Sequence, residues 1–283
     1  MSSVPKILYL CSKIMEEAII TSVQNARIKH VVALQQKSSL RREEGLFVVE
    51  GQREIEHCIA CGYEVVEMFS RDVECGARPN EMTTFVTPQV YEKMAYRGST
   101  EGMIAVARCK DHSLSSFLIS HSSFHQKTTP LIVVLESVEK PGNLGAILRT
   151  AEAAGVDAVI VCDPLTDLYN PNLIRASIGG VFSVPVAVCN SMECIDFLKE
   201  QKICILTAQL QDSYDYYDYD MRGATAIVMG TESTGLTPQW RKVADAHIRI
   251  PMLGRLDSLN VSVSAAILMY EAVRQRKCFN VKS

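Results

Sequence analysis

Three loops carry the polar side chains that could do chemistry in this chain. The last of them leads from Gly254 into a helix start where Ser258 and Asn260 stand among small residues. Nothing bulky in this stretch would block the close approach of a ligand. Because Ser and Asn are also the ordinary N-cap residues of helices, the stretch alone fits tight packing as well as a binding site.

The other two loops each follow a short apolar run. Residues 139–151 read EKPGNLGAILRTA, and residues 230–236 read GTESTGL. Neither loop is a common nucleotide fingerprint, because the first lacks a Gly-Lys-Ser/Thr ending and no G-x-G-x-x-G follows a strand. Taken singly, each could be a turn, with Asn143 as a helix cap, Arg149 as a surface helix residue and Glu232 as a turn carboxylate.

The second half of the chain contains the elements that must position these loops. Apolar runs and helical patterns alternate there, which favours an α/β fold with a mostly parallel sheet covered on both faces. Ligands of such sheets usually bind at the carboxyl ends of the strands, where the loops lie. The predicted strands are 131–135, 158–162, 184–188, 203–206, 226–229 and 247–250, and the predicted helices are 144–154, 172–179, 194–201, 238–244 and a tail helix from 258.

The first half repeats the alternation on a smaller scale and predicts a compact α/β domain. Its predicted strands are 46–49, 65–69, 84–86 and 103–107, and its predicted helices are 22–40, 53–61 and 88–94. Gly45 and Gly62 are expected to end two of these helices. A Ser-, Thr- and His-rich segment predicts a linker at 113–130 between a domain at 18–112 and a domain at 131–283. Residues 1–17 are expected to be an extension, within which Met15 is an equally good start.

Length and composition limit the kinds of protein that this chain can be. With 283 residues, 47% of them hydrophobic, the chain can bury a large core, and its net charge of −3 excludes a polybasic RNA-coating protein. No apolar run approaches the roughly 20 residues of a membrane helix, so no membrane association is expected. The ten cysteines are scattered, which favours reduced thiols and a cytoplasmic location. The pair Cys58 and Cys61 lacks a second pair at zinc spacing, so no metal is expected.

A local cluster of positive charge is the one candidate nucleic-acid contact outside the loops. Residues 27–42 contain Arg27, Lys29, Lys37, Arg41 and Arg42 and no acidic residue. The alternative is a solvated helix face. The Tyr- and Asp-rich run at 214–220 is expected to be a solvated loop that would repel phosphates.

Taken together, the three loops resemble the three signature motifs of the SpoU family of RNA 2′-O-ribose methyltransferases, members of the SPOUT superfamily. The matching segments are PGNLGAILRTAEAAGVDAVIV, IVMGTESTGL and IPMLGRLDSLNVSVSAA. The resemblance covers residues 131–277, and the N-terminal domain is similar to the RNA substrate-binding domain of ribosomal RNA members. It implies a SPOUT domain with a deep trefoil knot, which departs from the general absence of knots.

The resemblance also implies a cofactor and an assembly. S-adenosylmethionine would lie against Gly230, Ile250 and Leu259, largely through backbone groups, with Met229, Thr231, Gly235 and Met252 beside it. Gly230 would let the ligand approach the backbone, because glycine has no Cβ. Family members act as homodimers whose sites form at the subunit interface.

For catalysis, the resemblance points to Asn143, Arg149, Glu232, Ser258 and Asn260. The reaction is an in-line displacement of a sulfonium-bound methyl group by a ribose 2′-hydroxyl, which requires alignment of two bound reactants and no metal. Because free arginine is effectively always protonated, Arg149 is expected first to grip the phosphate beside the target ribose, and only second to act as a base. Arg175 resembles a further RNA-facing position. Ser233 departs from the Gly or Ala usual after the motif 2 glutamate.

These features predict an S-adenosylmethionine-dependent enzyme that methylates a ribose 2′-hydroxyl in ribosomal RNA. A transfer RNA substrate is the nearest alternative. A knotted RNA-binding or ribosome-assembly factor without catalysis is a second class, which the presence of Asn143, Arg149, Glu232 and Asn260 disfavours. An antibiotic-resistance methyltransferase would use the same chemistry and has the same sequence features.

Overall fold

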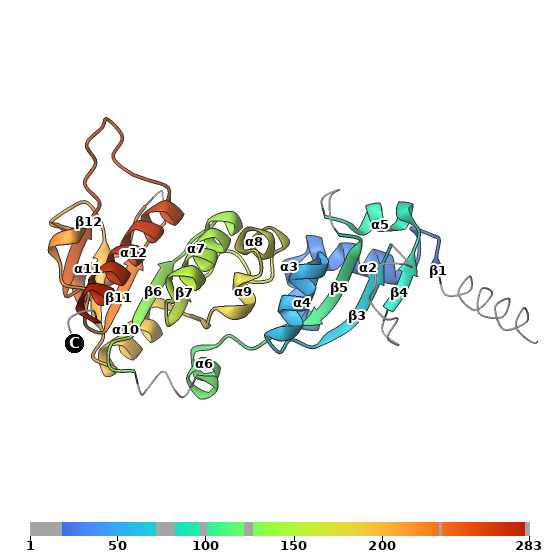
Figure 1. Ribbon diagram of the computed structural model, residues 1–283, viewed down its shortest axis with the longest axis horizontal. Coiled ribbons are helices and arrows are strands. Elements are labelled where there is room, and N and C mark those ends of the chain that lie inside the picture. The colour runs from blue at the N-terminus through green and yellow to red at the C-terminus, as the bar shows by residue number, and fades with distance from the viewer. Residues whose placement is uncertain (1–18, 72–82, 97–100, 122–126, 232–233, 281–283) are drawn as a thin grey trace, which may run out of the picture. The chain divides into compact units, whose positions relative to one another are not determined.

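The computed structural model divides the chain into two units that meet between Lys110 and Asp111. It describes residues 19–71, 83–96, 101–121, 127–231 and 234–280 (Figure 1). The division lies two residues before the predicted end of the first domain. The predicted extension at 1–17 lies outside the described residues.

The first unit is a mixed sheet covered by helices. Its strand order is β1-β4-β3-β5-β2, with β5 antiparallel to both β2 and β3. Apolar residues of α2 and α5 pack on these strands to form its core, including Ile28, Val90 and Ile104. The strands are β1 Ile19–Ile20, β2 Leu46–Glu50, β3 Val65–Ser70, β4 Thr83–Val86 and β5 Met103–Arg108; the helices are α2 Ala26–Gln36, α3 Ser38–Glu44, α4 Gln52–Ala60 and α5 Pro88–Met94.

The single helix predicted at 22–40 is two helices. Lys37 has extended backbone angles (φ −115°, ψ 107°) and separates α2 from α3. The last carbonyl groups of α2 find a partner in Arg41, whose Nη1 donates to the oxygens of Leu34 (2.5 Å) and Gln35 (3.1 Å). Gly45 then ends α3 in the left-handed region (φ 64°), as predicted.

The second unit is built on a seven-stranded sheet in the order β10-β12-β9-β11-β6-β7-β8, and every strand pair in it is parallel. The strands are β6 Leu131–Glu136, β7 Ala158–Cys162, β8 Val186–Cys189, β9 Cys204–Ala208, β10 Tyr214–Asp215, β11 Thr225–Met229 and β12 Ala246–Arg249; a 3-10 turn, η2, spans Tyr216–Asp218. The predicted α/β class with a parallel sheet is confirmed.

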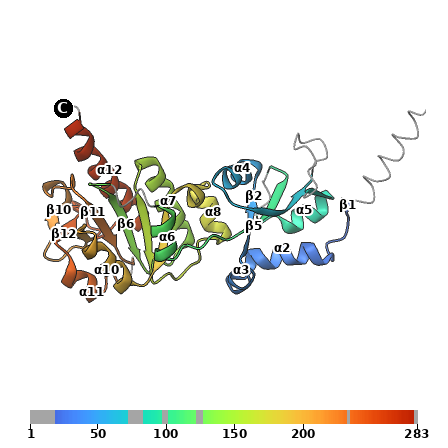
Figure 2. The same cartoon turned by 90° about the horizontal axis from the view of Figure 1, so that it is seen from below.

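Helices cover both faces of this sheet. They are α6 Leu114–Ser120, α7 Pro141–Ala154, α8 Pro171–Ser177, α9 Gly180–Ser183, α10 Ser191–Glu200, α11 Pro238–Val243 and α12 Val261–Asn280. One side chain in two along the strands, such as Ile132, Ile160 and Val228, packs with α6, α10 and α11. Figure 2 shows α10 and α11 on one side of the sheet and α7 and α12 on the other.

Two predicted segments differ from the structure in this unit. Residues 114–120 of the predicted linker form α6, whose Phe117 is buried in the sheet core and whose N-cap is Ser113. The helix predicted at 172–179 ends at Ser177, because Ile178 and Gly179 both adopt positive φ (49° and 80°) before α9 begins.

Side chains near the end of the tail helix α12 bind the segments that lead into β11 and β6, and Gln275 donates to the backbone oxygen of Tyr219 (3.0 Å). Arg276 donates hydrogen bonds to the backbone oxygens of Met221 (3.0 Å), Gly223 (2.6 Å) and Thr129 (2.7 Å). Partial burial lowers the pKa of its guanidinium. Within the described ranges, no helix is both long and apolar enough to cross a bilayer. The trefoil knot stays a prediction from the resemblance.

Candidate active site

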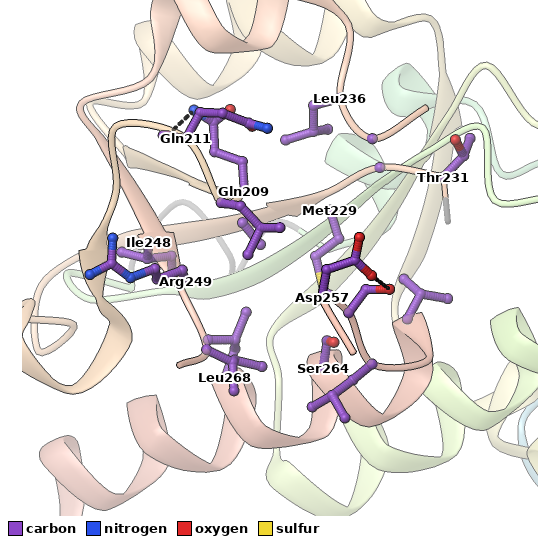
Figure 3. A pocket seen from close by; sticks show the side chains of 18 of the residues that line it. Gln209, Gln211, Met229, Thr231, Leu236, Ile248, Arg249, Asp257, Ser264 and Leu268 are labelled. Atoms are coloured by element: carbon purple, nitrogen blue, oxygen red, sulfur yellow. Dashed lines mark hydrogen bonds between the residues drawn. The ribbon is translucent and has the colours of Figure 1, made fainter. Parts of the chain in front are cut away.

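A pocket opens at the carboxyl ends of β9, β11 and β12 (Figure 3). Its volume is approximately 360 Å³. The start of α12 and the loop before it close one side, through Ser258, Val261 and Ser264. All residues predicted to hold the cofactor line this pocket: Met229, Gly230, Thr231, Gly235, Ile250, Met252 and Leu259.

The loop after β11 crosses over its own backbone. A Cβ on Gly230 would lie 2.3 Å from the carbonyl carbon and oxygen of Gly235 and 2.6 Å from the nitrogen of Leu236. Gly235 also donates from its N–H to the Thr231 oxygen (3.0 Å). The glycine at 230 is therefore required by this backbone crossing. The sequence suggested that Gly230 lets a ligand approach the backbone. In the structure, a Cβ at this position would clash with the chain's own backbone before it obstructed a ligand.

The deep part of the pocket is apolar. Leu236, Ile248 and Leu268 are buried there, at 4%, 0% and 1% exposure. One polar atom stands out among them, because the Gln209 Oε1 is buried and accepts no hydrogen bond within the described residues. The Nε2 of the same side chain donates to the Gln211 oxygen (2.9 Å), which fixes which end of the amide is the acceptor.

These residues fit S-adenosylmethionine, the cofactor that the motifs imply. The volume falls within the roughly 300–1,000 Å³ of small-molecule sites. The apolar lining suits an adenine ring, and the unused Gln209 Oε1 suits an amino group, since a buried acceptor without a donor costs about 1–3 kcal/mol. The backbone groups of the crossed loop supply further polar partners.

The start of α12 is tied to the start of α7. The Asn260 Nδ2 donates to the Asn143 Oδ1 (3.1 Å), across 117 positions of sequence. The Asn260 Oδ1 accepts from the N–H (2.9 Å) and hydroxyl (2.6 Å) of Ser262 and so caps α12. A smaller cavity of approximately 130 Å³ lies at this junction, lined in part by Asn143, Gly230 and Val261. Motifs 1, 2 and 3 therefore meet at one place.

Arg149 is not brought into this junction. It lies six residues after Asn143 on α7, about 120° away around the helix axis. The backbone of α9 packs against the backbone of Arg149, with the Gly180 Cβ position 3.4 Å from the Arg149 Cα. The Arg149 side chain is exposed and, in the part of the chain that the structure describes, lines neither cavity and makes no hydrogen bond or ion pair.

The remaining predicted catalytic residues have different outcomes. Ser258 lines the pocket and donates to the Asp257 carboxylate (3.3 Å). Glu232 and Ser233 lie outside the described residues.

The positive cluster of the first unit is only partly available to RNA. Arg41 is 3% exposed and binds backbone oxygens inside the unit, so its assignment to RNA binding is wrong. Arg27 pairs with Glu67 and donates to the Thr84 hydroxyl (2.7 Å). Lys29 and Arg42 are exposed, as is Arg175 of α8 in the second unit.

Several lining residues were missed from the sequence, among them Gln209, Arg241 and Asp257. Gln209 follows a predicted strand at its carboxyl end, so the rule for parallel sheets could have found it. No pattern in the sequence marks Arg241, because it belongs to a short helix that reaches the pocket only through the fold.

Two family models match the chain. The SpoU rRNA Methylase family matches residues 130–270, and the MRM3-like substrate binding domain matches residues 25–105. The 23S rRNA (guanosine-2′-O-)-methyltransferase RlmB of Vibrio vulnificus is 36% identical over 68% of this chain and 77% of its own length. The chain belongs to the SpoU rRNA methylase family.

Similarity to other SpoU proteins extends over nearly the whole chain. The 23S rRNA (guanosine(2553)-2′-O)-methyltransferase RlmP of Bacillus subtilis is 27% identical over 89% of this chain and 97% of its own length. A crystal structure of an AdoMet-bound rRNA methyltransferase from Sinorhizobium meliloti has a TM-score of 0.80 at 28% identity, and covers 90% of this chain and 97% of that one. The first unit is thus shared with ribosomal RNA enzymes of the SpoU family.

Proposed function

We propose that this SpoU protein transfers a methyl group from S-adenosylmethionine to the 2′-hydroxyl of a ribose in ribosomal RNA. The observation that carries the proposal is the Asn143–Asn260 hydrogen bond, which joins motifs 1 and 3 beside the pocket of motif 2. A cofactor-sized pocket thus lies beside Asn143 and Asn260, two residues that match the family's motifs, which supports the proposal. The matching substrate-binding domain at 25–105 supports ribosomal RNA over transfer RNA.

The residues of the chain divide the work. When bound, S-adenosylmethionine supplies an electrophilic methyl group on a sulfonium. The backbone at Gly230, Thr231 and Gly235 and the apolar floor would hold the cofactor. Ser258 would support the entrance of the pocket, and Asn260 would hold the start of α12 against Asn143. Arg149 would grip the phosphate beside the target ribose and so orient the hydroxyl, because a guanidinium keeps its proton and is a poor base. The less favoured alternative is that Arg149 acts as the base that removes the proton of the 2′-hydroxyl.

A second copy of the chain would complete the site. Arg149 lies away from both cavities of its own chain, whereas apolar side chains around the pocket entrance are exposed. Leu253 is 99%, Leu256 76% and Val263 47% exposed. A C2 homodimer that covers these side chains would remove apolar surface from water and bring Arg149 of one copy to the pocket of the other. A cytoplasmic location is part of the same proposal.

The first test is a methylation assay. Ribosomal RNA from a strain lacking the gene is incubated with methyl-labelled S-adenosylmethionine and the purified protein, and the product is hydrolysed in alkali. A 2′-O-methylated linkage resists alkali because its oxygen can no longer attack the phosphodiester. We expect labelled, alkali-resistant dinucleotides with wild type, and a turnover lower by roughly 10²-fold with Arg149→Ala.

Two controls separate the parts of the proposal. Calorimetry should give the same cofactor affinity for Arg149→Ala as for wild type, and Lys199→Ala, which removes an exposed cation on α10, should keep full turnover. Unchanged turnover in Arg149→Ala would refute its role. RNA binding without any label in ribosomal or transfer RNA would favour the non-catalytic factor.

The shared site has its own test. Arg149→Ala and Asn260→Ala chains are mixed under conditions that exchange subunits. In a shared site, about one quarter of all sites regain both intact halves, so activity returns in the mixture. Sites confined to one chain would stay inactive at every mixing ratio.

A further inference from the structure

Three cysteines meet at a place that the proposed function does not use. The Sγ atoms of Cys162, Cys189 and Cys194 all lie within 4.8 Å of one another. Cys162 and Cys194 are fully buried, whereas Cys189 is partly exposed. None of the three lines the cofactor pocket or the cavity at Asn143.

Rigid elements bring these sulfurs together. Cys162 ends β7 and Cys189 ends β8, and the two are paired across the parallel strands. Cys194 comes from the start of α10, which is fixed by a capping box between Asn190 and Glu193. Each of the three cysteines thus belongs to a strand or a helix and not to a loop. Rigid elements hold the three sulfurs in place before a metal ion binds, which is the preorganisation that a metal site needs.

The spacing suits a metal ion. For three atoms no more than 4.8 Å apart, some point lies within about 2.8 Å of all of them, and a contraction of ~0.5 Å would bring this to the 2.3 Å of a Zn–S bond. Thiolates select soft ions such as Zn²⁺ and Cu⁺ over Mg²⁺ or Ca²⁺. We propose that Cys162, Cys189 and Cys194 bind one thiophilic d¹⁰ metal ion, with Zn²⁺ as its representative.

Charge decides how such an ion binds. On binding, each thiol that becomes a ligand releases its proton to solvent, and three thiolates with Zn²⁺ leave a net charge of −1. No fourth His, Cys, Asp or Glu ligand joins the group among the described residues. A water on the side of Cys189, the partly exposed member, would complete a tetrahedron.

The carboxylates next to the cysteines in the sequence or the sheet are held in structural contacts and are not ligands. Asp163 accepts from the Ser191 N–H (3.1 Å), and Glu136 accepts from the Thr237 N–H (2.8 Å). The Glu193 carboxylate accepts from the Asn190 N–H (3.0 Å). These hydrogen bonds hold each carboxylate in a structural contact, and none of the three carboxylates joins the sulfur cluster. The bound ion would fasten the ends of β7 and β8 to α10, whether or not the chain methylates RNA.

The test is a zinc titration of the whole protein. Metal-free protein, kept reduced by a phosphine, competes for Zn²⁺ with a chromogenic chelator. We expect one equivalent bound by wild type, a midpoint of thermal unfolding that rises by a few degrees with zinc, and a thiolate-to-metal absorption band with Co²⁺. Cys189→Ser should weaken zinc binding by at least about tenfold and lose the band.

A matched variant controls for zinc binding by cysteines outside the cluster. Cys61→Ser disrupts the Cys58–Cys61 pair and should bind zinc as wild type does. Cys194→Ala, which puts a strong helix former into α10, should lose binding with its circular dichroism unchanged and so covers the case in which Cys189→Ser misfolds. Absence of an equivalent of bound zinc in reduced wild type, or wild-type zinc affinity in both cluster variants, would overturn the proposal. Peroxide-driven disulfide formation within the trio, without zinc binding, would replace it with a redox pair.

Discussion

Some cationic residues of the first unit are bound within it, whereas Lys29 and Arg42 of that unit are exposed, as are Arg149 and Arg175 of the second unit. In the first unit, Arg41 is buried against the end of α2 and Arg27 pairs with Glu67. In the second unit, the side chains of Arg149 and Arg175 are exposed and make no ion pair or hydrogen bond in the described ranges. A run of basic residues in the sequence therefore shows only where positive charge lies along the chain. RNA can bind only those cationic side chains that are exposed and not already paired within the fold.

The energetic roles differ accordingly. Arg41 satisfies carbonyl groups that a helix end leaves without partners, so it stabilises the fold. Arg149 and Arg175 sit on α7 and α8, which pack closely, and contribute nothing visible to that packing. We expect this arrangement if the second unit carries the phosphate contacts nearest the reacting groups. The substitutions below test which arginines stabilise the fold and which remain available to RNA.

The largest effect is expected for Arg41→Ala. The oxygens of Leu34 and Gln35 lose their donor and a buried side chain is deleted, so the free energy of unfolding of the first unit should fall by about 2–4 kcal/mol. Urea unfolding followed by circular dichroism measures the change. Arg42→Ala, one residue further and exposed, should stay within about 0.5 kcal/mol of wild type. Equal effects of the two substitutions would refute the distinction between buried and available charge.

The next largest effect is expected for the packing of α7 against α8. A Cβ on Gly145 would lie 2.6 Å from the Leu173 oxygen and 2.7 Å from the Ala176 Cβ, so Gly145→Ala should cost about 1–3 kcal/mol of stability. Gly142→Ala, on the same helix, would meet nothing within 4 Å and should be neutral or slightly stabilising. Differential scanning calorimetry of both variants decides the point. A destabilised Gly142→Ala with a normal Gly145→Ala would contradict the α7–α8 contact.

The link between motifs 1 and 3 should be smaller. A double-mutant cycle with Asn143→Ala and Asn260→Ala should give a coupling energy of about 0.5–1.5 kcal/mol in unfolding, because one neutral hydrogen bond joins the two side chains. Thermal or urea unfolding of wild type, the two single variants and the double variant supplies the four free energies. Strict additivity would show that the bond contributes nothing to the assembly of the site.

The smallest effect concerns salt. Arg175→Gln should reduce the slope of log affinity against log salt by about one, if Arg175 contacts one phosphate, so that RNA binding weakens about tenfold near 0.1 M salt and little near 1 M. Arg27→Gln should leave the slope unchanged, because Arg27 is already paired with Glu67. Fluorescence anisotropy over a range of KCl concentrations measures both. The reverse result would return the RNA contact to the first unit.

Local pattern determined much of this protein. The predicted strand 158–162 and helix 88–94 agree with β7 and α5 residue for residue, because an apolar run between turns and a proline at a helix start are local signals. The three loops could be picked out for the same reason, since each follows a strand end. All the predicted cofactor residues line one pocket, because the carboxyl ends of adjacent parallel strands meet at one edge.

Tertiary structure alone decided what those residues touch. The crossing of Gly230 over Gly235, the burial of Arg41 and the meeting of three cysteines depend on how segments fold back on one another. Residue type sets what a side chain can do, and spacing sets which element carries it. Three properties depend on distances between groups far apart in the chain: whether a charged side chain is unpaired, whether an acceptor lacks a hydrogen bond, and whether a thiol lies next to other thiols. The sequence pattern does not contain those distances.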